Sequence, residues 1–326
     1  MCFLTSTLWW LAALLTASAT PIDDVDQFGE GWTRLPSITR GPRQEHAVVA
    51  SGNAIWILGG NSPDAVEYYS PTDGGWHTAS PMISPLNHLN AAAVGDEIFV
   101  LGGLSAGDEW LAQDISMVYS PSSNSWQPRS PLPAGTARGA CAVGVYRNKI
   151  YLAGGMTYLE ATQDALTTVT SYDVTSDSWD LNLPLLPRPR QHVAGVVVGS
   201  TFYVLGGRED GQLKVQNTVY ALDLESPGFG WKEMASMPTP RGGLACAAVQ
   251  QNIYCFGGEG NPNAASGVFD QVEVYDTTRN TWANLNPMPV PRHGWGVATV
   301  GNTIFVPGGG VQEGTAPTDY FDSFTP

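Results

Sequence analysis

The sequence is short of basic side chains, and this limits the partners that the protein can bind. It has 326 residues, with 15 Lys and Arg against 30 Asp and Glu, a formal net charge of −15 and a pI near 4.5. A surface of this charge repels phosphate backbones and anionic lipid head groups, and no run of Lys or Arg offsets it. We therefore expect no binding to nucleic acid.

No hydrophobic run is long enough to cross a bilayer. The first apolar run, residues 8–15, is followed by small side chains at residues 17–19, a pattern typical of a secretory signal peptide. We predict that residues 1–19 form this peptide, with cleavage near Ala19. The short acidic segment 20–28 would then begin a secreted chain with no membrane anchor. A buried N-terminal helix or an uncleaved anchor is the alternative.

Cysteine is scarce. The chain has 4 cysteines, which are Cys2, Cys141, Cys246 and Cys255. Loss of Cys2 with the signal peptide leaves an odd number, so at least one thiol stays unpaired in an oxidising compartment. Residues 247–254 resemble a β-hairpin, and a turn at Gln250-Gln251 sets Cys246 opposite Cys255, within reach of a cross-strand disulfide. Three buried, reduced cysteines that pack as small hydrophobic groups are the alternative.

Motifs of familiar catalytic machinery are absent. The sequence has no Gly-x-Ser-x-Gly, no phosphate-binding glycine loop and no dinucleotide fingerprint. It has no His-x-x-x-His, His-x-His or paired-carboxylate spacing either. We therefore expect neither a cofactor nor a metal ion. Ligands assembled from distant segments would leave no such spacing, so a catalytic ion stays open.

Glycine and proline, in contrast, are abundant. The 37 Gly and 24 Pro are spread evenly along the chain, as many short strands joined by turns require. At 43% hydrophobic residues the chain can bury a sizeable core. The composition therefore predicts an all-β protein.

A repeat with three recurring features runs along the sequence. A Gly-Gly pair follows an apolar run six times, at steps of 43, 52, 52, 51 and 51 residues, beginning at Gly59, Gly102, Gly154, Gly206, Gly257 and Gly308. Sixteen residues before each pair stand Arg43, Leu86, Arg138, Arg190, Arg241 and Arg292. A Tyr and a Trp come later, as Tyr69/Trp76, Tyr119/Trp126, Tyr172/Trp179, Tyr220/Trp231 and Tyr275/Trp282. Such a period indicates stacked units of one supersecondary type.

Each repeat predicts four short strands. The innermost strands, such as residues 91–94 and 195–198, consist of small residues, because strands around a narrow axis have no room for larger ones. The sixth repeat lacks its Trp, and Trp32 near the start of the chain would supply the missing outer strand. Closing the ring in this way removes an exposed sheet edge.

The repeat resembles the kelch family, whose pattern is Arg, an apolar strand, Gly-Gly, Tyr-Asp and Trp. Tyr172-Asp173 and Tyr275-Asp276 match this pattern in full, and the resemblance covers residues 29–326. It implies a six-bladed kelch β-propeller whose last blade is closed by the N-terminal strand. The chain departs from the secreted fungal copper-radical oxidases of kelch type, which have seven blades, so we expect no copper site.

The mouth of a propeller's axial channel is the default ligand site, and residues that break the repeat are the better candidates for function. For catalysis we select His88, His293 and Arg292. For substrate binding we select Asn87, Arg43, Arg190, Trp110, Tyr158, Trp295 and Glu259. A structural role is expected for most of the Arg series, because every blade repeats it, and His46 and His192 are expected to be packed residues.

The resemblance leaves more than one function open. Small secreted fungal kelch propellers imply a monomeric, cofactor-independent enzyme that acts on a small organic molecule. Such an enzyme would be a cyclase, lyase or isomerase of a secondary-metabolite pathway, with hetero-Diels–Alder coupling as one example. Six-bladed bacterial sialic-acid mutarotases imply sugar epimerisation instead. A non-catalytic module that binds a protein or glycan is the alternative from another class.

Overall fold

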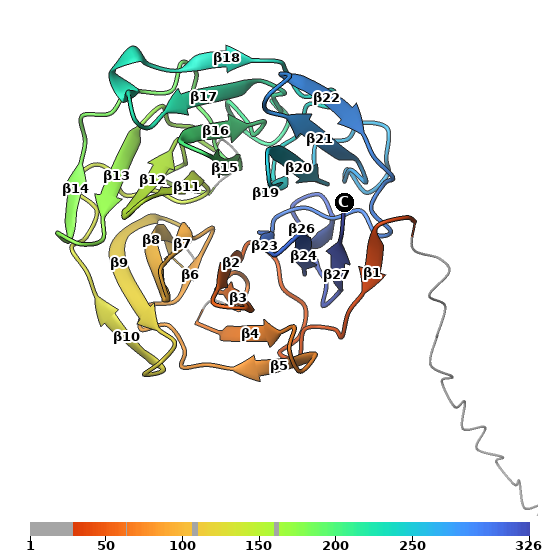
Figure 1. Cartoon of the computed structure of the whole chain (residues 1–326), viewed down its shortest axis with the longest axis horizontal. Helices are drawn as coiled ribbons and strands as arrows, with labels where there is room; N and C mark the ends of the chain where they lie inside the picture. The colour runs from red at the N-terminus through yellow and green to blue at the C-terminus, as the bar shows by residue number, and fades with distance from the viewer. Residues whose placement is uncertain (1–28, 63, 106–109, 160–162) are drawn as a thin grey trace, which may run out of the picture.

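Six small β-sheets surround a central axis in the computed structural model, which describes residues 29–62, 64–105, 110–159 and 163–326 (Figure 1). The predicted fold is confirmed: the chain is an all-β, six-bladed propeller. The predicted signal peptide and acidic segment lie outside the described residues. Within the described part, no helix is long and apolar enough to span a membrane.

The blades follow one another in chain order. Blades one and two are β2 (Ala47–Ser51), β3 (Ala54–Leu58), β4 (Val66–Ser70) and β5 (Gly75–Thr78), then β7 (Ala91–Val94), β8 (Glu97–Ser105), β9 (Ala112–Ser120) and β10 (Ser125–Pro128), with β6 (Leu86–Asn87) beside β8. Blades three and four are β11 (Ala142–Tyr146), β12 (Lys149–Ala153), β13 (Val169–Asp173) and β14 (Ser178–Asp180), then β15 (Ala194–Val198), β16 (Thr201–Leu205), β17 (Val219–Asp223) and β18 (Lys232–Met234), preceded by the 3₁₀ turn η2 (Pro227–Phe229). Blades five and six are β19 (Ala245–Val249), β20 (Asn252–Phe256), β21 (Val272–Asp276) and β22 (Thr281–Asn284), then β23 (Ala298–Val300), β24 (Thr303–Pro307), β27 (Phe321–Phe324) and β1 (Trp32–Arg34). A hairpin of β25 (Gly310–Gln312) and β26 (Thr315–Pro317) projects from blade six.

The two ends of the chain meet in the sixth blade. β1 lies beside β27, with Trp32 opposite Phe324 and Arg34 opposite Asp322 (Figure 1). Arg34 Nε donates to Asp322 Oδ1 over 2.6 Å, and the Trp32 ring packs on Phe256 of the neighbouring blade. The N-terminal closing strand predicted from Trp32 is therefore confirmed, and it covers the edge that blade six would otherwise expose.

Inner and outer strands use different residues for different packing. At Gly195 in β15 a Cβ atom would overlap the backbone of Val143 in β11, so only glycine fits where these innermost strands approach. The outer-strand tryptophans each donate their indole N–H to a carbonyl near the outer strand of the preceding blade; the pairs are Trp76 with Pro36, Trp126 with Ser80, Trp179 with Ser130, Trp231 with Pro184, and Trp282 with Ala235. The recurring Trp thus fastens each of blades one to five to the blade before it.

The hairpin of β19 and β20 turns at Gln250-Gln251, as the spacing predicts, and its cysteines are joined. Cys246 lies directly opposite Cys255 and the two form a disulfide, with Cα atoms 4.2 Å apart. Cys141 is buried and unpaired, and burial raises the pKa of its thiol to about 11. Of the two alternatives for this pair, the structure contains the cross-strand bridge.

Candidate functional site

A ring of six residues in left-handed backbone conformation surrounds the channel axis where the innermost strands begin. Its members have φ between 46° and 64° and are Glu45, His88, Ala140, His192, Gly243 and Gly294. Each stands fourteen residues before the Gly-Gly pair of its blade. Five of them donate a backbone N–H to the carbonyl of the preceding member over 2.5–3.0 Å, namely Glu45, His88, Ala140, Gly243 and Gly294. We call this set the left-handed ring.

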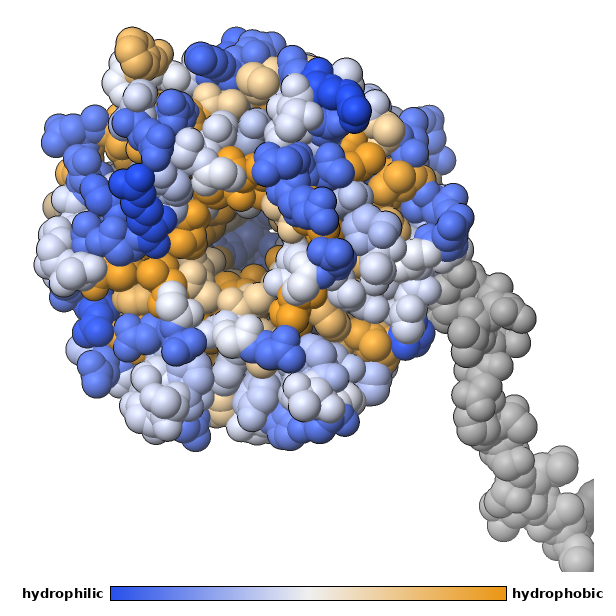
Figure 2. Space-filling model, in the orientation of Figure 1, coloured by the Kyte–Doolittle hydropathy of each residue, from blue (hydrophilic) through white to orange (hydrophobic). Residues whose placement is uncertain are grey.

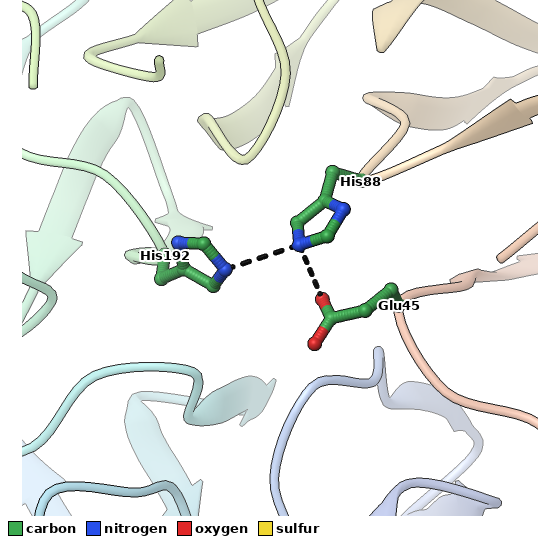
Figure 3. A group of neighbouring side chains, drawn as sticks. All are labelled: Glu45, His88 and His192. Atoms are coloured by element: carbon green, nitrogen blue, oxygen red, sulfur yellow. Dashed lines mark hydrogen bonds and ion pairs between the residues drawn. The ribbon is translucent and has the colours of Figure 1, made fainter. Parts of the chain in front are cut away.

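Three members of the left-handed ring carry polar side chains, and these converge (Figure 3). His88 Nε2 lies 3.1 Å from His192 Nε2 and 3.1 Å from Glu45 Oε2. The His88 side chain is 3% exposed and that of Glu45 is 15% exposed. A left-handed conformation costs a non-glycine residue about 1–2 kcal/mol, and because all six ring positions adopt it, it belongs to the repeat and sets the direction of these three side chains.

The side-chain amide of Asn87 determines which nitrogen of His88 carries the proton. Asn87 donates its Nδ2 to the Ser105 carbonyl over 3.1 Å, so its Oδ1 is the atom that faces His88 Nδ1 at 2.7 Å. An amide oxygen only accepts, so His88 Nδ1 must donate. In the neutral ring, Nε2 therefore presents a lone pair to Glu45 and His192.

A longer chain of hydrogen bonds determines which nitrogen of His192 carries the proton. Arg208 can only donate, and its Nη1 lies 3.2 Å from Gln163 Oε1, which also accepts from Gln191 Nε2 over 2.9 Å. The oxygen of Gln191 is thereby left to face His192 Nδ1 and accept its proton. In the neutral ring, His192 Nε2 therefore also carries a lone pair, which points at His88 Nε2.

Burial changes the charge state of both imidazoles. Burial lowers the pKa of His88, although the carboxylates of Glu45 and Glu259 oppose the shift. Burial also holds the pKa of His192 well below its ordinary value, and the nearby Arg208 and His88 lower it further. Both rings are therefore uncharged near neutral pH, and three hydrogen-bond acceptors meet at one point.

A second polar cluster, Arg208, Glu259 and His293, lies behind the first. Glu259 pairs with Arg208, accepts the Gly314 backbone N–H over 2.8 Å, and lies 3.3 Å from His293 Nδ1. Burial alone would raise the pKa of Glu259, but His293 and Arg208 outweigh it and lower this pKa to about 2. For His293, burial opposes the charge, but Glu259 reverses the effect and raises the pKa. The charges of this buried cluster are therefore paired with one another.

The converging residues close one end of a channel. A section of about 110 Å³ is lined by the left-handed ring and by the residues that follow each member, among them Cys141 and Trp295. It shares wall residues with a wider section of about 570 Å³, lined by the small apolar residues of the innermost strands. Figure 2 shows a hollow at the centre of the molecule, with hydrophobic residues around its wall. A ligand in the wider section therefore meets small apolar side chains with polar atoms accessible between them, and it meets the polar side chains of the left-handed ring at one end.

The Arg series lies inside the blades, which corrects three predicted roles. Arg43, Arg190 and Arg292 are at most 1% exposed and do not line either channel section. Arg43 pairs with Glu67 of β4 at 2.8 Å, and Arg292 pairs with Asp322 of β27 at 2.5 Å. Because their guanidiniums are already paired within their own blades, the geometry gives them a structural role and no contact with substrate.

Five other predicted residues lie in or near the two polar clusters. His88 is central, Asn87 orients it, and Trp295 lines both channel sections. Glu259 and His293 belong to the second cluster and do not line the channel.

The two predicted rim aromatics lie apart from the channel lining. The Trp110 side chain is half-exposed, and its ring meets the His88 ring edge to face with centroids 6.2 Å apart. Trp110 therefore lies beside the converging cluster. Tyr158 forms a β-bridge with Leu111 and lies outside the lining of both channel sections. The rim therefore contributes one aromatic neighbour, Trp110, to the site.

The sequence pattern did not single out Glu45 or the contact that His192 makes. His192 was expected to be a packed residue, yet its Nε2 lies 3.1 Å from His88 Nε2. The available signal was position within the repeat: His88, His192 and Glu45 share the slot fourteen residues before Gly-Gly, whereas His46 and His293 do not. His46 is the packed residue that was expected, with Nε2 3.1 Å from the Pro307 carbonyl.

The fold places the chain in the class of six-bladed β-propellers. The solved structure of YjhT matches it with a TM-score of 0.72, over 88% of this chain and 96% of that chain, at 16% sequence identity. At this identity the likeness shows the shared fold alone.

The repeats identify the family. A model of the KLHDC2/KLHL20/DRC7 Kelch-repeats domain matches residues 182–323, and a Kelch motif model matches residues 137–181. Kelch-like protein terF of Aspergillus terreus is 37% identical over 313 residues, which cover 90% of this chain and 68% of terF. The chain belongs to the kelch-repeat family.

Animal relatives are more distant and longer. Kelch-like protein 34 of Homo sapiens is 25% identical over 311 residues, and the match covers 90% of this chain but 38% of that protein. Alpha-scruin of Limulus polyphemus is 26% identical over 242 residues, 71% of this chain and 26% of alpha-scruin. The chain thus spans less than half the length of these relatives.

Proposed function

We propose that this protein is an enzyme that converts a small organic molecule bound in the axial channel, by a non-redox reaction of the lyase, isomerase or cyclase type. The observation that carries the proposal is the convergence of Glu45, His88 and His192 from three blades at one end of the axial channel. Three acceptor atoms at one point can take a proton from a substrate. They can also hold a cation that stabilises negative charge developing on the substrate.

The channel has room for a small organic substrate. Its wider section has a volume of about 570 Å³, within the range of small-molecule sites, and its wall is built from Ala, Val and Gly of the innermost strands. The small side chains leave polar atoms accessible between them, so the wall can contact both apolar and polar parts of a small organic substrate.

We further propose that the protein acts as a monomer outside the cytoplasm, in a fungal secondary-metabolite pathway. The disulfide between Cys246 and Cys255 supports an oxidising compartment. The similarity to a fungal kelch protein supports a fungal setting.

The proposal is tested by comparing metabolites from host strains that differ only in this gene. Strains carry no gene, the wild type, Glu45→Gln, or Glu233→Gln, which changes an exposed carboxylate of the outer strand β18 as a matched control. We expect the product to vanish and its precursor to accumulate without the gene and with Glu45→Gln, while Glu233→Gln behaves as wild type. Full product formation by a folded Glu45→Gln variant would remove Glu45 from the reaction, and full product formation without the gene would leave the protein as a binding module.

A further inference from the structure

Three acceptor atoms point at one another with no donor among them. Asn87 and Gln191 occupy the Nδ1 protons of His88 and His192, so each neutral ring offers only its Nε2 lone pair to the centre. Glu45 adds a carboxylate oxygen 3.1 Å from His88 Nε2. Buried polar atoms are normally paired, so either a shared proton or a bound cation between them would satisfy this arrangement.

We propose that Glu45, His88 and His192 bind a divalent transition-metal ion, with zinc as the ion that this ligand set fits. Their ligand atoms all lie within 4.8 Å of one another. Zinc holds imidazole nitrogen and carboxylate oxygen at about 2.0–2.2 Å, which sets tetrahedral ligands roughly 3.3 Å apart. The two separations of 3.1 Å are close to that spacing, so only small shifts are needed.

The surroundings of the two histidines are those of metal ligands. A ligating histidine usually donates its second ring N–H to an oxygen that fixes its orientation, as His88 does to Asn87 and His192 does to Gln191. The Gln191 amide is itself held by Gln163, and Gln163 by Arg208. Both imidazoles are thus oriented before any ion binds.

The remaining ring positions leave room for the site. Ala140, Gly243 and Gly294 add no polar group, and a Cβ atom on Gly294 would overlap Glu45 Oε1. Gly294 thereby allows the carboxylate of Glu45 to take its position. With three protein ligands and the cavity of about 110 Å³ beside them, one coordination position faces the channel, as in catalytic rather than structural zinc sites.

The inference does not depend on the proposed reaction, because binding of zinc alone is measured without substrate. The purified full chain is stripped with a chelator and titrated with Zn²⁺ by calorimetry and by competition with a chromophoric chelator. We expect one Zn²⁺ per chain and a higher melting temperature with zinc, while Mg²⁺ causes neither effect.

Variants assign the ion to these ligands. Glu45→Gln, His88→Ala and His192→Ala are each expected to weaken zinc binding more than tenfold, and Gln191→Leu by about 10–100-fold. His77→Ala is the matched control, because His77 is a half-exposed histidine paired with Asp73 on an outer strand; it is expected to leave binding unchanged. Near-UV circular dichroism confirms that each variant is folded.

Two outcomes overturn the inference. One is the lack of stoichiometric zinc binding by the wild type, which would mean that a shared proton satisfies the three acceptors. The other is binding that survives in folded Glu45→Gln and His192→Ala. Either result leaves the metabolite comparison intact as a test of the proposed enzyme.

Discussion

Two positions of the repeat, only two residues apart, have opposite properties. The position sixteen residues before Gly-Gly is Arg in five blades and points into its own blade, where it is buried. The position fourteen residues before Gly-Gly varies and forms the left-handed ring around the channel, where Glu45, His88 and His192 meet. The residue that recurs packs inside its own blade, and the residues that vary at the position fourteen residues before Gly-Gly form the converging cluster on which the proposed function rests.

Blade two shows how the repeated position can change without loss of the fold. Leu86 takes the place of the Arg. Met117 takes the place of the carboxylate that pairs with this Arg, which is Glu67 in blade one and Glu273 in blade five. Leu86 and Met117 are both fully buried and belong to one hydrophobic cluster. An apolar pair has therefore replaced a buried ion pair as a unit, in line with the high desolvation cost of buried charges.

The largest expected effect comes from breaking one such pair. Arg241→Ala leaves the fully buried carboxylate of Glu273 without its partner at 2.7 Å, so we expect a loss of about 3–5 kcal/mol in unfolding free energy, measured by urea denaturation. The double variant Arg241→Leu with Glu273→Met copies blade two and is expected to recover most of the loss.

The control for this prediction is Arg147→Ala, since Arg147 is largely exposed and pairs with the exposed Glu225. It should cost little, because exposed ion pairs contribute little. A double variant as unstable as Arg241→Ala would contradict the view that the pair is replaceable as a unit.

The second polar cluster predicts an acid-sensitive stability. The pKa of Glu259 is lowered to about 2 in the fold by His293 and Arg208, the charged groups that face it. Since the folded pKa is below the unfolded one, this contribution is complete above about pH 4.5 and is lost as the pH falls toward 2. This contribution of Glu259 to the free energy of unfolding amounts to roughly 3 kcal/mol.

Urea denaturation between pH 5 and 2 measures this contribution as the difference between wild type and Glu259→Gln. The variant should be less stable at pH 5, with a difference that shrinks as the pH falls. Glu225→Gln, at an exposed pair, is the control and should show no such trend. A constant difference across this range would show that Glu259 does not titrate as described.

Recurrence explains how much could be predicted from the sequence. The propeller, its number of blades and the closing strand at Trp32 follow from patterns that repeat every 43 to 52 residues, so each repeat supports the others. Glu45 has no such support, because its role depends on side chains from blades two and four that the sequence does not bring near it. The same limit led to the choice of Arg292, whose partner Asp322 lies 30 residues away.

Within the left-handed ring, glycine and non-glycine members should respond oppositely to substitution. Gly294→Ala puts a Cβ atom at φ 64° and against Glu45 Oε1, so we expect a loss of about 1–2 kcal/mol in unfolding free energy and weaker zinc binding. Gly301→Ala is the control, because Gly301 has a similar φ of 61° but no atom within 4 Å of an added Cβ. It should cost stability without changing zinc affinity. Unchanged zinc binding in Gly294→Ala would separate Gly294 from the site.

The smallest effect is expected at Ala140, the one member of the ring that has a side chain but no polar group. Its φ of 54° imposes the same strain that Glu45, His88 and His192 carry, yet it contributes no atom to the converging cluster. Ala140→Gly relieves about 1–2 kcal/mol of strain but adds flexibility to the unfolded chain, so the net gain in unfolding free energy should be below about 1 kcal/mol. Chemical denaturation measures this gain, and zinc titration should show unchanged affinity. A loss of stability would mean that the Ala140 methyl group contributes packing that outweighs its strain.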